Sequence, residues 1–170
     1  MKSEVVMDTN VAVAASGRAP QANITCIRAC IETLKRIRAE HRIRLDDAGL
    51  ILKEYRQQLS FSGQPGVGDA FFKWLWANQA NELFCHRVTL TPIDDDPQNF
   101  AEFPADADLT GFDPSDRKFV AAALAENEPV PIFNATDTDW WRFREALARH
   151  HVTVEFICPE LMPPPHAPEI

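Results

Sequence analysis

Short apolar runs separated by polar segments predict several β-strands along the chain. Residues 4–8, EVVMD, form an apolar run that ends on an acid, which is typical of a buried central strand. Residues 42–46 and 86–93 instead alternate between apolar and polar positions, as strands with one buried face do. Two later runs, PVPIFN at 129–134 and VTVEFIC at 152–158, predict the last two strands.

Helical spacing of apolar residues fills the segments between these strands. The first helix is indicated by apolar residues three or four positions apart, at Ile24, Ile27, Ile31 and Leu34. The same reasoning predicts further helices at about 47–59, 69–83, 116–127 and 138–150. Because strands and helices alternate, we expect an α/β fold. Its form should be a three-layer α/β/α sandwich with a mostly parallel central sheet and a ligand site at the carboxyl ends of the strands.

Two segments lack such periodicity. Residues 92–115 hold five Pro or Gly and seven Asp or Glu, and we expect a long irregular connection there. Residues 159–170 contain five prolines and are expected to form an extended tail outside the fold. A chain of 170 residues has the size of one domain, so we predict a single domain over residues 1–158 followed by this tail.

The chain is acidic, with a formal net charge of −8. This charge argues against a protein that holds nucleic acid mainly through a broad basic surface. It does not argue against an enzyme that binds metal through carboxylates, because bound cations reverse the sign of the charge that a phosphate meets. The first ten residues hold only a short apolar run before an acid, so we expect a cytoplasmic protein without a signal peptide or membrane contact.

The four cysteines form neither a CxxC pair nor the His and Cys spacing of a zinc finger; they are Cys26, Cys30, Cys85 and Cys158. We therefore expect four reduced thiols. Cys26 and Cys30 stand one helical turn apart among isoleucines, where a role in the core is favoured over a redox role.

Two acids stand at the starts or ends of predicted elements. Asp8 ends the first strand, so its carboxylate should lie at the carboxyl edge of the sheet, with Thr9 and Asn10 beside it. For Asp8 alone an ordinary turn role is the favoured interpretation. Asp116 opens the helix at 116–127 in line with its apolar face, where an acid needs either a function or satisfaction by the helix N-terminus.

A second group of acids follows the strand at 129–134. Asp137 should lie at the same edge of the sheet, between Thr136 and a helix that carries Asp139 in its first turn. Capping of that helix is the structural alternative, but capping and metal binding are compatible.

Glu54 lies on the edge of the apolar stripe of the helix at 47–59, where a solvated flank with charge pairs is favoured for this residue taken alone. The combination of acids is more informative than any one of them. Several carboxylates without paired His or Cys suit Mg²⁺ or Mn²⁺ rather than zinc, and such ions activate water for phosphodiester cleavage.

Four segments, VVMDTNVAVAA, ILKEYRQQL, DPSDRKFVAAALA and VPIFNATDTDWW, together resemble a PIN domain in their order and spacing. That family has an Asp-Thr/Ser-Asn start on its first strand, a helical Glu in mid-chain, an Asp at the start of an Ala-rich helix and a late pair of Asp residues. The resemblance covers nearly the whole chain. It implies a metal-dependent endoribonuclease that hydrolyses phosphodiester bonds of single-stranded or structured RNA, with Mg²⁺ or Mn²⁺ as its cofactor.

The resemblance also implies roles for individual residues. The catalytic acids would be Asp8, Glu54, Asp116 and Asp137, and the metal ligands would be three of these, Asp8, Asp116 and Asp137, together with Asp139. The substrate contacts would come from Thr9, Asn10, Arg117 and Thr136.

PIN proteins include many toxins of bacterial toxin–antitoxin pairs, so the resemblance implies a toxin role and an antitoxin partner. Four aromatic residues surround more of the helix at 69–83 than a single buried stripe needs: Phe71, Phe72, Trp74 and Trp76. They predict a partner surface for a homodimer or an antitoxin. Trp140 and Trp141 are candidates for stacking on an unpaired base, with core packing favoured for at least one of them.

Two other functions fit parts of the pattern. A haloacid-dehalogenase-like phosphatase also begins with an apolar strand and an Asp, but residue 10 is Asn where that family needs a second Asp. A PIN-like fold could also serve as an RNA- or protein-binding module without cleavage. Divalent-ion binding or activity would separate that module from a nuclease.

Overall fold

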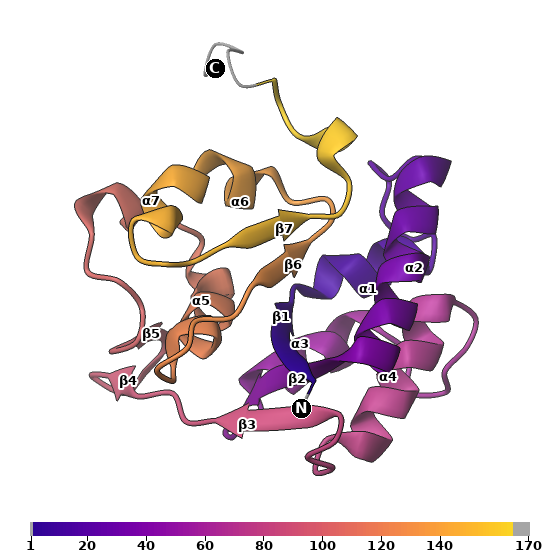
Figure 1. Ribbon diagram of the computed structural model, residues 1–170, viewed down its shortest axis with the longest axis horizontal. Coiled ribbons are helices and arrows are strands. Elements are labelled where there is room, and N and C mark those ends of the chain that lie inside the picture. The colour runs from indigo at the N-terminus through magenta and orange to yellow at the C-terminus, as the bar shows by residue number, and fades with distance from the viewer. Residues whose placement is uncertain (1, 165–170) are drawn as a thin grey trace.

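The computed structural model describes residues 2–164, with a five-stranded parallel sheet at its centre (Figure 1). The strands lie in the order β3-β2-β1-β6-β7, and each neighbouring pair is parallel. Their bounds are Ser3–Met7 for β1, His41–Asp46 for β2, Cys85–Val88 for β3, Ile132–Asn134 for β6 and Val154–Phe156 for β7. The sheet and its flanking helices confirm the predicted three-layer α/β/α fold.

Helices flank the sheet on both sides. On one side α1, α2 and α4 pack against one another, α5, α6 and α7 lie on the other side, and α3 follows the end of β2 (Figure 1). The bounds are Thr9–Ala15 for α1, Ile24–Glu40 for α2, Leu50–Gln58 for α3, Val67–Asn78 for α4, Arg117–Leu124 for α5, Thr138–Arg142 for α6 and Arg144–Ala148 for α7. Within residues 2–164, no helix combines the length and the apolar character needed to span a bilayer.

A buried arginine on β2 holds helix α5 in place. Arg44 is 1% exposed, and its Nη1 donates hydrogen bonds to the carbonyls of Ala122 and Ala123 at 3.1 and 3.2 Å. Its Nη2 pairs with Glu4 on β1 at 3.0 Å. The last carbonyls of a helix carry a partial negative charge, so together with Glu4 they stabilise the buried cation. The carboxyl end of α5 is thereby fixed to the two central strands.

The prediction of an irregular connection over residues 92–115 is wrong in part. The segment contains an antiparallel pair of strands, β4 Pro92–Ile93 and β5 Asp96–Phe100, followed by 3-10 helices at Ala107–Leu109 and Pro114–Asp116. Three apolar side chains of this segment, each 1% exposed, anchor it in the core: Phe100, Leu109 and Phe112. Because the anchors are widely and unevenly spaced, neither a helical nor a strand period reveals them.

The prediction of four reduced thiols is also wrong in part. Cys26 on α2 and Cys158 after β7 form a disulfide across 132 residues, whereas Cys30 and Cys85 are free and buried. Sequence spacing cannot show that residues so far apart will meet.

The prediction of an extended tail from residue 159 onward is wrong for the residues that directly follow the disulfide. A 3-10 helix at Pro159–Leu161 follows Cys158 directly, and Met162 is buried. The start of the predicted tail is therefore packed against the domain rather than extended outside it. The remainder of that prediction, for residues 165–170, lies outside the described residues.

The aromatic residues of α4 pack within the chain. Phe71 and Phe72 are buried, and the Trp74 ring lies 5.1 Å from the Phe84 ring and 4.8 Å from the Arg38 guanidinium. Trp76 contacts the ring of Phe61, with 4.8 Å between ring centroids. The helix surface on which the prediction of a homodimer or antitoxin contact was based is therefore largely covered by the chain itself.

Helix α4 approaches α1 so closely that one position requires glycine. A Cβ atom at Gly68 would lie 1.9 Å from the Ala12 carbonyl oxygen, and the Gly68 N–H donates to the Ser16 hydroxyl at 2.9 Å. Next to it, the buried Asp69 pairs with Arg18 at 2.7 Å, and this hydrogen-bonded partner lowers the pKa of Asp69 to about 2. The two helices are therefore fixed in register at the start of α4.

Replacement of Gly68 by Ala should separate these helices, because the backbone oxygen of Ala12 cannot move independently of α1. We expect the free energy of unfolding, measured by urea denaturation, to fall by about 1–3 kcal/mol or more. Gly111→Ala is the matched control, since its Cβ would meet only the Phe143 ring at 3.8 Å and should change stability by less than about 0.5 kcal/mol. Equal effects of the two substitutions would contradict the close approach.

Candidate metal centre

The alignment of β1 with β6 brings together two acids from opposite ends of the chain. Met7 lies opposite Phe133 in these parallel strands, and the Asp8 N–H donates to the Phe133 carbonyl at 3.0 Å. Asp8 therefore lies beside Asn134 at the carboxyl edge of the sheet. Asp137 follows three residues later, in the loop that opens α6, and its carboxylate caps that helix by accepting the N–H of Asp139 at 2.9 Å. Both acids thus lie at the edge of the sheet that the strand pattern predicts.

Asp116 reaches the same place from another element. It ends the 3-10 helix Pro114–Asp116 and directly precedes α5, which packs against β1. Asp113 fixes the start of this turn, because its Oδ1 accepts the N–H and the hydroxyl of Ser115, both at 2.9 Å. Asp116 itself is 7% exposed. An acid at the start of α5 is thus directed inward, as its place in the apolar periodicity predicts.

The three carboxylates converge. One carboxylate oxygen from each of Asp8, Asp116 and Asp137 lies within 4.8 Å of the other two. They line a cavity of about 380 Å³ together with Glu54 and Asp113. Among the described residues, no Lys, Arg or His lines this cavity. The site is therefore a polar hollow with five acids and no positive charge on its wall.

Burial and mutual repulsion make the charged forms of these acids unfavourable. Burial, and then the negative charges of Asp8 and Asp137, raise the pKa of Asp116 to about 9. Burial likewise raises the pKa of Asp8 to about 7, with the charge of Glu54 adding to the effect. The pKa of Asp137 is also raised, mainly by burial. Without a cation, this group holds protons at neutral pH that ordinary aspartates would have lost.

A tryptophan fixes the orientation of Asp8. The indole N–H of Trp140, which is fully buried, donates to Asp8 Oδ2 at 2.8 Å, while the Asn10 N–H donates to Oδ1 at 3.0 Å. Trp140 is therefore a core residue that positions a carboxylate. The proposed stacking on a base is excluded for Trp140 by its burial, and the Trp141 ring packs against Phe156 with 5.2 Å between centroids.

Two asparagines connect the loops that carry Asp8 and Asp137. The Asn10 side chain donates to Asn134 Oδ1 at 2.8 Å and accepts the Ala135 N–H at 2.9 Å. Asn134 is fully buried, and its amide group donates to the Asp137 carbonyl at 3.0 Å. Asn134 was not among the predicted site residues, although an Asn that ends a buried strand is a signal that could have identified it. Asn10 thus fixes the shape of the site through both ends of its amide.

Glu54 borders the cavity without joining the close group of three. Its carboxylate accepts hydrogen bonds from the Thr9 hydroxyl and from Lys118 Nζ, the latter at 2.8 Å. The Lys118 ammonium also donates to the Ser115 carbonyl. The predicted helical Glu is therefore at the site, and the Lys118 ammonium partly neutralises its charge.

The other predicted site residues divide into two groups. Thr9, Asn10 and Thr136 line the cavity. Asp139 and Arg117 do not line it, and Asp139 is not part of the group of three carboxylates. The Arg117 guanidinium instead lies over the Phe103 ring, 5.0 Å from its centroid.

The donor set suits a hard divalent cation. Two oxygens that share one Mg²⁺ lie at most about 4.2 Å apart, because each is about 2.1 Å from the ion. One oxygen from each of the three aspartates already lies within 4.8 Å of the other two, which is close to this spacing. A cation would also remove the repulsion that raises their pKa values, so the residues present fit such a group.

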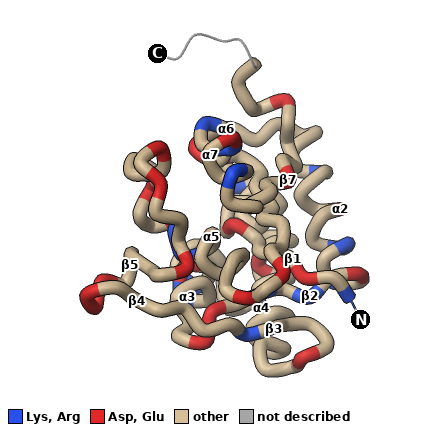
Figure 2. Tube along the Cα trace, turned by 60° about the vertical axis from the view of Figure 1, so that its left-hand side comes forward, with Lys and Arg blue, Asp and Glu red and all other residues tan. Residues whose placement is uncertain are grey.

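Acidic and basic positions are interspersed over several elements of the part of the chain that the structure describes (Figure 2). Asp94 and Asp95, in the turn between β4 and β5, and Asp96, the first residue of β5, are all exposed. Comparisons with protein-family models, with curated proteins and with solved structures gave no match. The geometry of the site and the resemblance in sequence are therefore the observations that bear on function.

The raised pKa values predict that the metal-free protein is more stable in mild acid than in mild base. Between the unfolded pKa of about 4 and the folded values, the folded state binds more protons than the unfolded state, so stability falls as pH rises. The free energy of unfolding in chelator should thus be lower at about pH 9 than at about pH 6. Asp116→Asn should raise it at the higher pH by at least about 1 kcal/mol and reduce the pH dependence. An unchanged pH profile in this variant would contradict the repulsion.

Trp140→Phe should weaken divalent-ion binding because Asp8 loses the donor that orients it. Loss of a partner to a metal ligand costs roughly 10- to 100-fold in affinity, and a Mn²⁺ titration followed by electron paramagnetic resonance would measure the change. Trp141→Phe is the matched control, since this neighbour packs on Phe156 and Arg144 outside the cavity. Equal Mn²⁺ affinities of the two variants would argue against the positioning role.

Proposed function

We propose that this protein is a nuclease of the PIN type, a Mg²⁺- or Mn²⁺-dependent endoribonuclease that cleaves phosphodiester bonds of RNA. The observation that carries the proposal is the convergence of Asp8, Asp116 and Asp137 within 4.8 Å in a polar cavity. The order of these acids along the chain, with Glu54 between the first two, is the order of the PIN resemblance. The three aspartates would hold the cation, and Glu54 would complete the acidic wall.

A divalent ion in this place would lower the pKa of a bound water and stabilise the negative charge that develops on phosphate oxygens. The residues of the chain provide the conditions for that chemistry. Asp116 must lose its proton before an ion can bind. Because the pKa of Asp116 is raised, binding of the ion should depend on pH. Trp140 and Asn10 hold the Asp8 carboxylate in one orientation from opposite sides.

A second groove next to the cavity could receive the nucleic-acid chain. It has a volume of about 290 Å³, shares Glu54 and Ser115 with the cavity, and is lined by Lys53 and Lys118. Lysines beside a metal site suit a phosphate backbone, since phosphate contacts position a strand without reading its bases. This arrangement supports a polynucleotide substrate more than a small phosphate monoester.

The alternatives make different demands on the same residues. A haloacid-dehalogenase-like phosphatase needs an acid two residues after its nucleophile, but Asn10 occupies that position and its amide is engaged by Asn134 and Ala135. A binding module without cleavage would not require three closely spaced carboxylates that repel one another. No observation favours either alternative over the nuclease.

The toxin role and an antitoxin partner belong to the proposal through the sequence resemblance. The geometry of the site itself supports only a metal cofactor and a polynucleotide substrate. Co-purification with the product of an adjacent gene and arrest of growth on expression would test the toxin role separately from the chemistry.

Asp8→Asn and Asp116→Asn should each slow Mn²⁺-dependent cleavage of single-stranded RNA by at least about 100-fold, because each removes a charged ligand. Gel assays of labelled RNA, with DNA of the same sequence as a second substrate, would measure the rates. Asp139→Asn is the matched control, since this neighbour of the site does not line the cavity. It should retain most of the activity.

Thermal melting would verify that all three variants fold. Undiminished cleavage by both Asp8→Asn and Asp116→Asn would refute the assignment of the site. Binding of RNA without any cleavage by the native chain would favour the binding module.

A further inference from the structure

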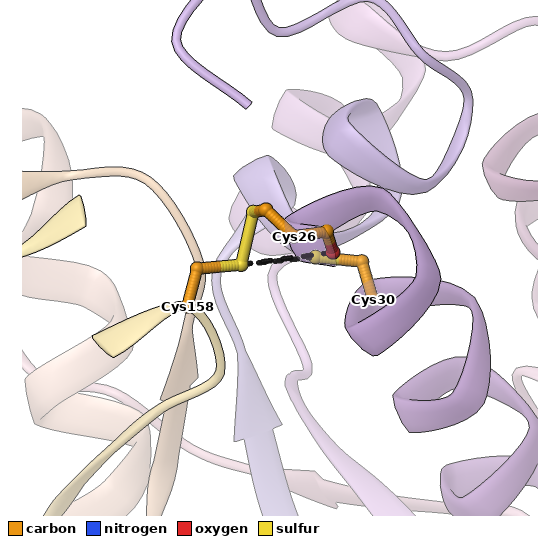
Figure 3. A group of neighbouring side chains, drawn as sticks. All are labelled: Cys26, Cys30 and Cys158. Carbon is orange, nitrogen blue, oxygen red and sulfur yellow. Dashed lines mark hydrogen bonds between the residues drawn. A yellow bond between two sulfur atoms is a disulfide. The ribbon is translucent and has the colours of Figure 1, made fainter. Parts of the chain in front are cut away.

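A second group of potential ligands, made of sulfur, lies away from the acidic cavity. Cys26 and Cys30 stand one turn apart on α2, and Cys158 reaches them from the end of β7 (Figure 3). All three side chains have 0% exposure, and their sulfur atoms lie within 4.8 Å of one another. Two of the sulfurs form the disulfide described above, while the Cys30 sulfur lies 3.9 Å from that of Cys158.

The disulfide accounts for two of these cysteines but not for the third. A buried cysteine often serves only as a small apolar residue in the core. Cys85 is an example in this fold, because it is 3% exposed and lies outside the group of three sulfurs. Cys30 differs because its sulfur is directed at the other two (Figure 3). Sulfurs bound to one Zn²⁺ at about 2.3 Å lie about 3.8–4.0 Å apart, and the Cys30 to Cys158 distance of 3.9 Å has this value.

We propose that, in the reduced protein, Cys26, Cys30 and Cys158 form a three-thiolate site for a thiophilic cation of the Zn²⁺ class. Soft sulfur ligands select such ions, whereas the aspartates select hard ones, so the two sites would take different metals. A tetrahedral ion would keep a fourth position for water or for a carboxylate.

Two balanced steps lead from the disulfide to the metal form. An external dithiol supplies two electrons and two protons, the bond between Cys26 and Cys158 breaks to give two thiols, and the dithiol becomes a disulfide. A divalent ion then forms three bonds to sulfur, and the three thiol protons pass to solvent. Either form joins α2 to the segment after β7, so the ion would replace the disulfide as the connection between these elements.

The consequence reaches the strand that builds the acidic site. The Ile157 N–H, next to Cys158, donates to the Asn134 carbonyl at 2.9 Å, and Asn134 holds the loop of Asp137. A metal bound at the three cysteines would therefore support the edge of the sheet beside that loop. Its role would be structural, since no cysteine lines the acidic cavity among the described residues.

The test uses the full chain purified under a non-thiol reductant, with Zn²⁺ or Cd²⁺ alone as the probe. We expect a sulfur-to-metal charge-transfer band with Cd²⁺, with an intensity that corresponds to one ion bound by three thiolates per chain, and competition with a chromophoric chelator gives the affinity for Zn²⁺. Carboxylates give no such band, so ions at the aspartates are not counted. The readout is independent of RNA cleavage, and its failure would leave the nuclease proposal untouched.

Cys30→Ser is the decisive variant, because it keeps the Cys26–Cys158 pair and should therefore fold in the oxidised state. We expect its affinity for Zn²⁺ to fall by more than the roughly 10- to 100-fold typical of a lost partner to a metal ligand. Cys85→Ser, the matched control, should bind like the native chain. The proposal would be overturned if reduced native protein and Cys30→Ser bound Cd²⁺ alike, or if the disulfide resisted reduction in the folded protein and no ion was taken up.

Discussion

The mutual repulsion of three closely spaced carboxylates, of which Asp8 and Asp116 are buried and Asp137 is half-buried, is the constraint around which the rest of this fold is organised. Asp8, Asp116 and Asp137 would move apart or into solvent if their backbones were free to do so. They are held because each stands where a regular element begins or ends, and those elements are themselves fixed by the parallel pairing of β1 with β6 and by the packing of α5 on β1. The stability of the sheet thus compensates for an unfavourable site.

Polar contacts behind the site give this arrangement its precision. Arg44 fixes the far end of α5 and so defines the direction from which Asp116 enters. Asn134 joins the two loops at the edge of the sheet, and Trp140 orients one carboxylate through a single hydrogen bond. All three side chains are at most 1% exposed. The polar interior therefore serves the geometry of the site as much as the cohesion of the core.

The sequence predicted the parts of the site that depend on local pattern. Asp8 and Asp137 follow apolar strands, and Asp116 interrupts an apolar helical face, so each is visible from its neighbours along the chain. The contacts of Trp140 and Lys118 were not predictable in this way, because their partners lie 132 and 64 residues away in sequence. The disulfide between Cys26 and Cys158 was missed for the same reason, since the two residues are 132 positions apart. The architecture of the sheet was predicted because it follows from strand and helix patterns that are local in sequence.

The disulfide between Cys26 and Cys158 has a consequence for the integrity of the chain, because it encloses most of the domain in one covalent loop. The exposed turn between β4 and β5 lies inside that loop. A protease that cut the chain there would leave two fragments that still travel together in a non-reducing gel. Nicked molecules would keep the halves of the sheet, and with them the three aspartates, attached to each other until a reductant released them.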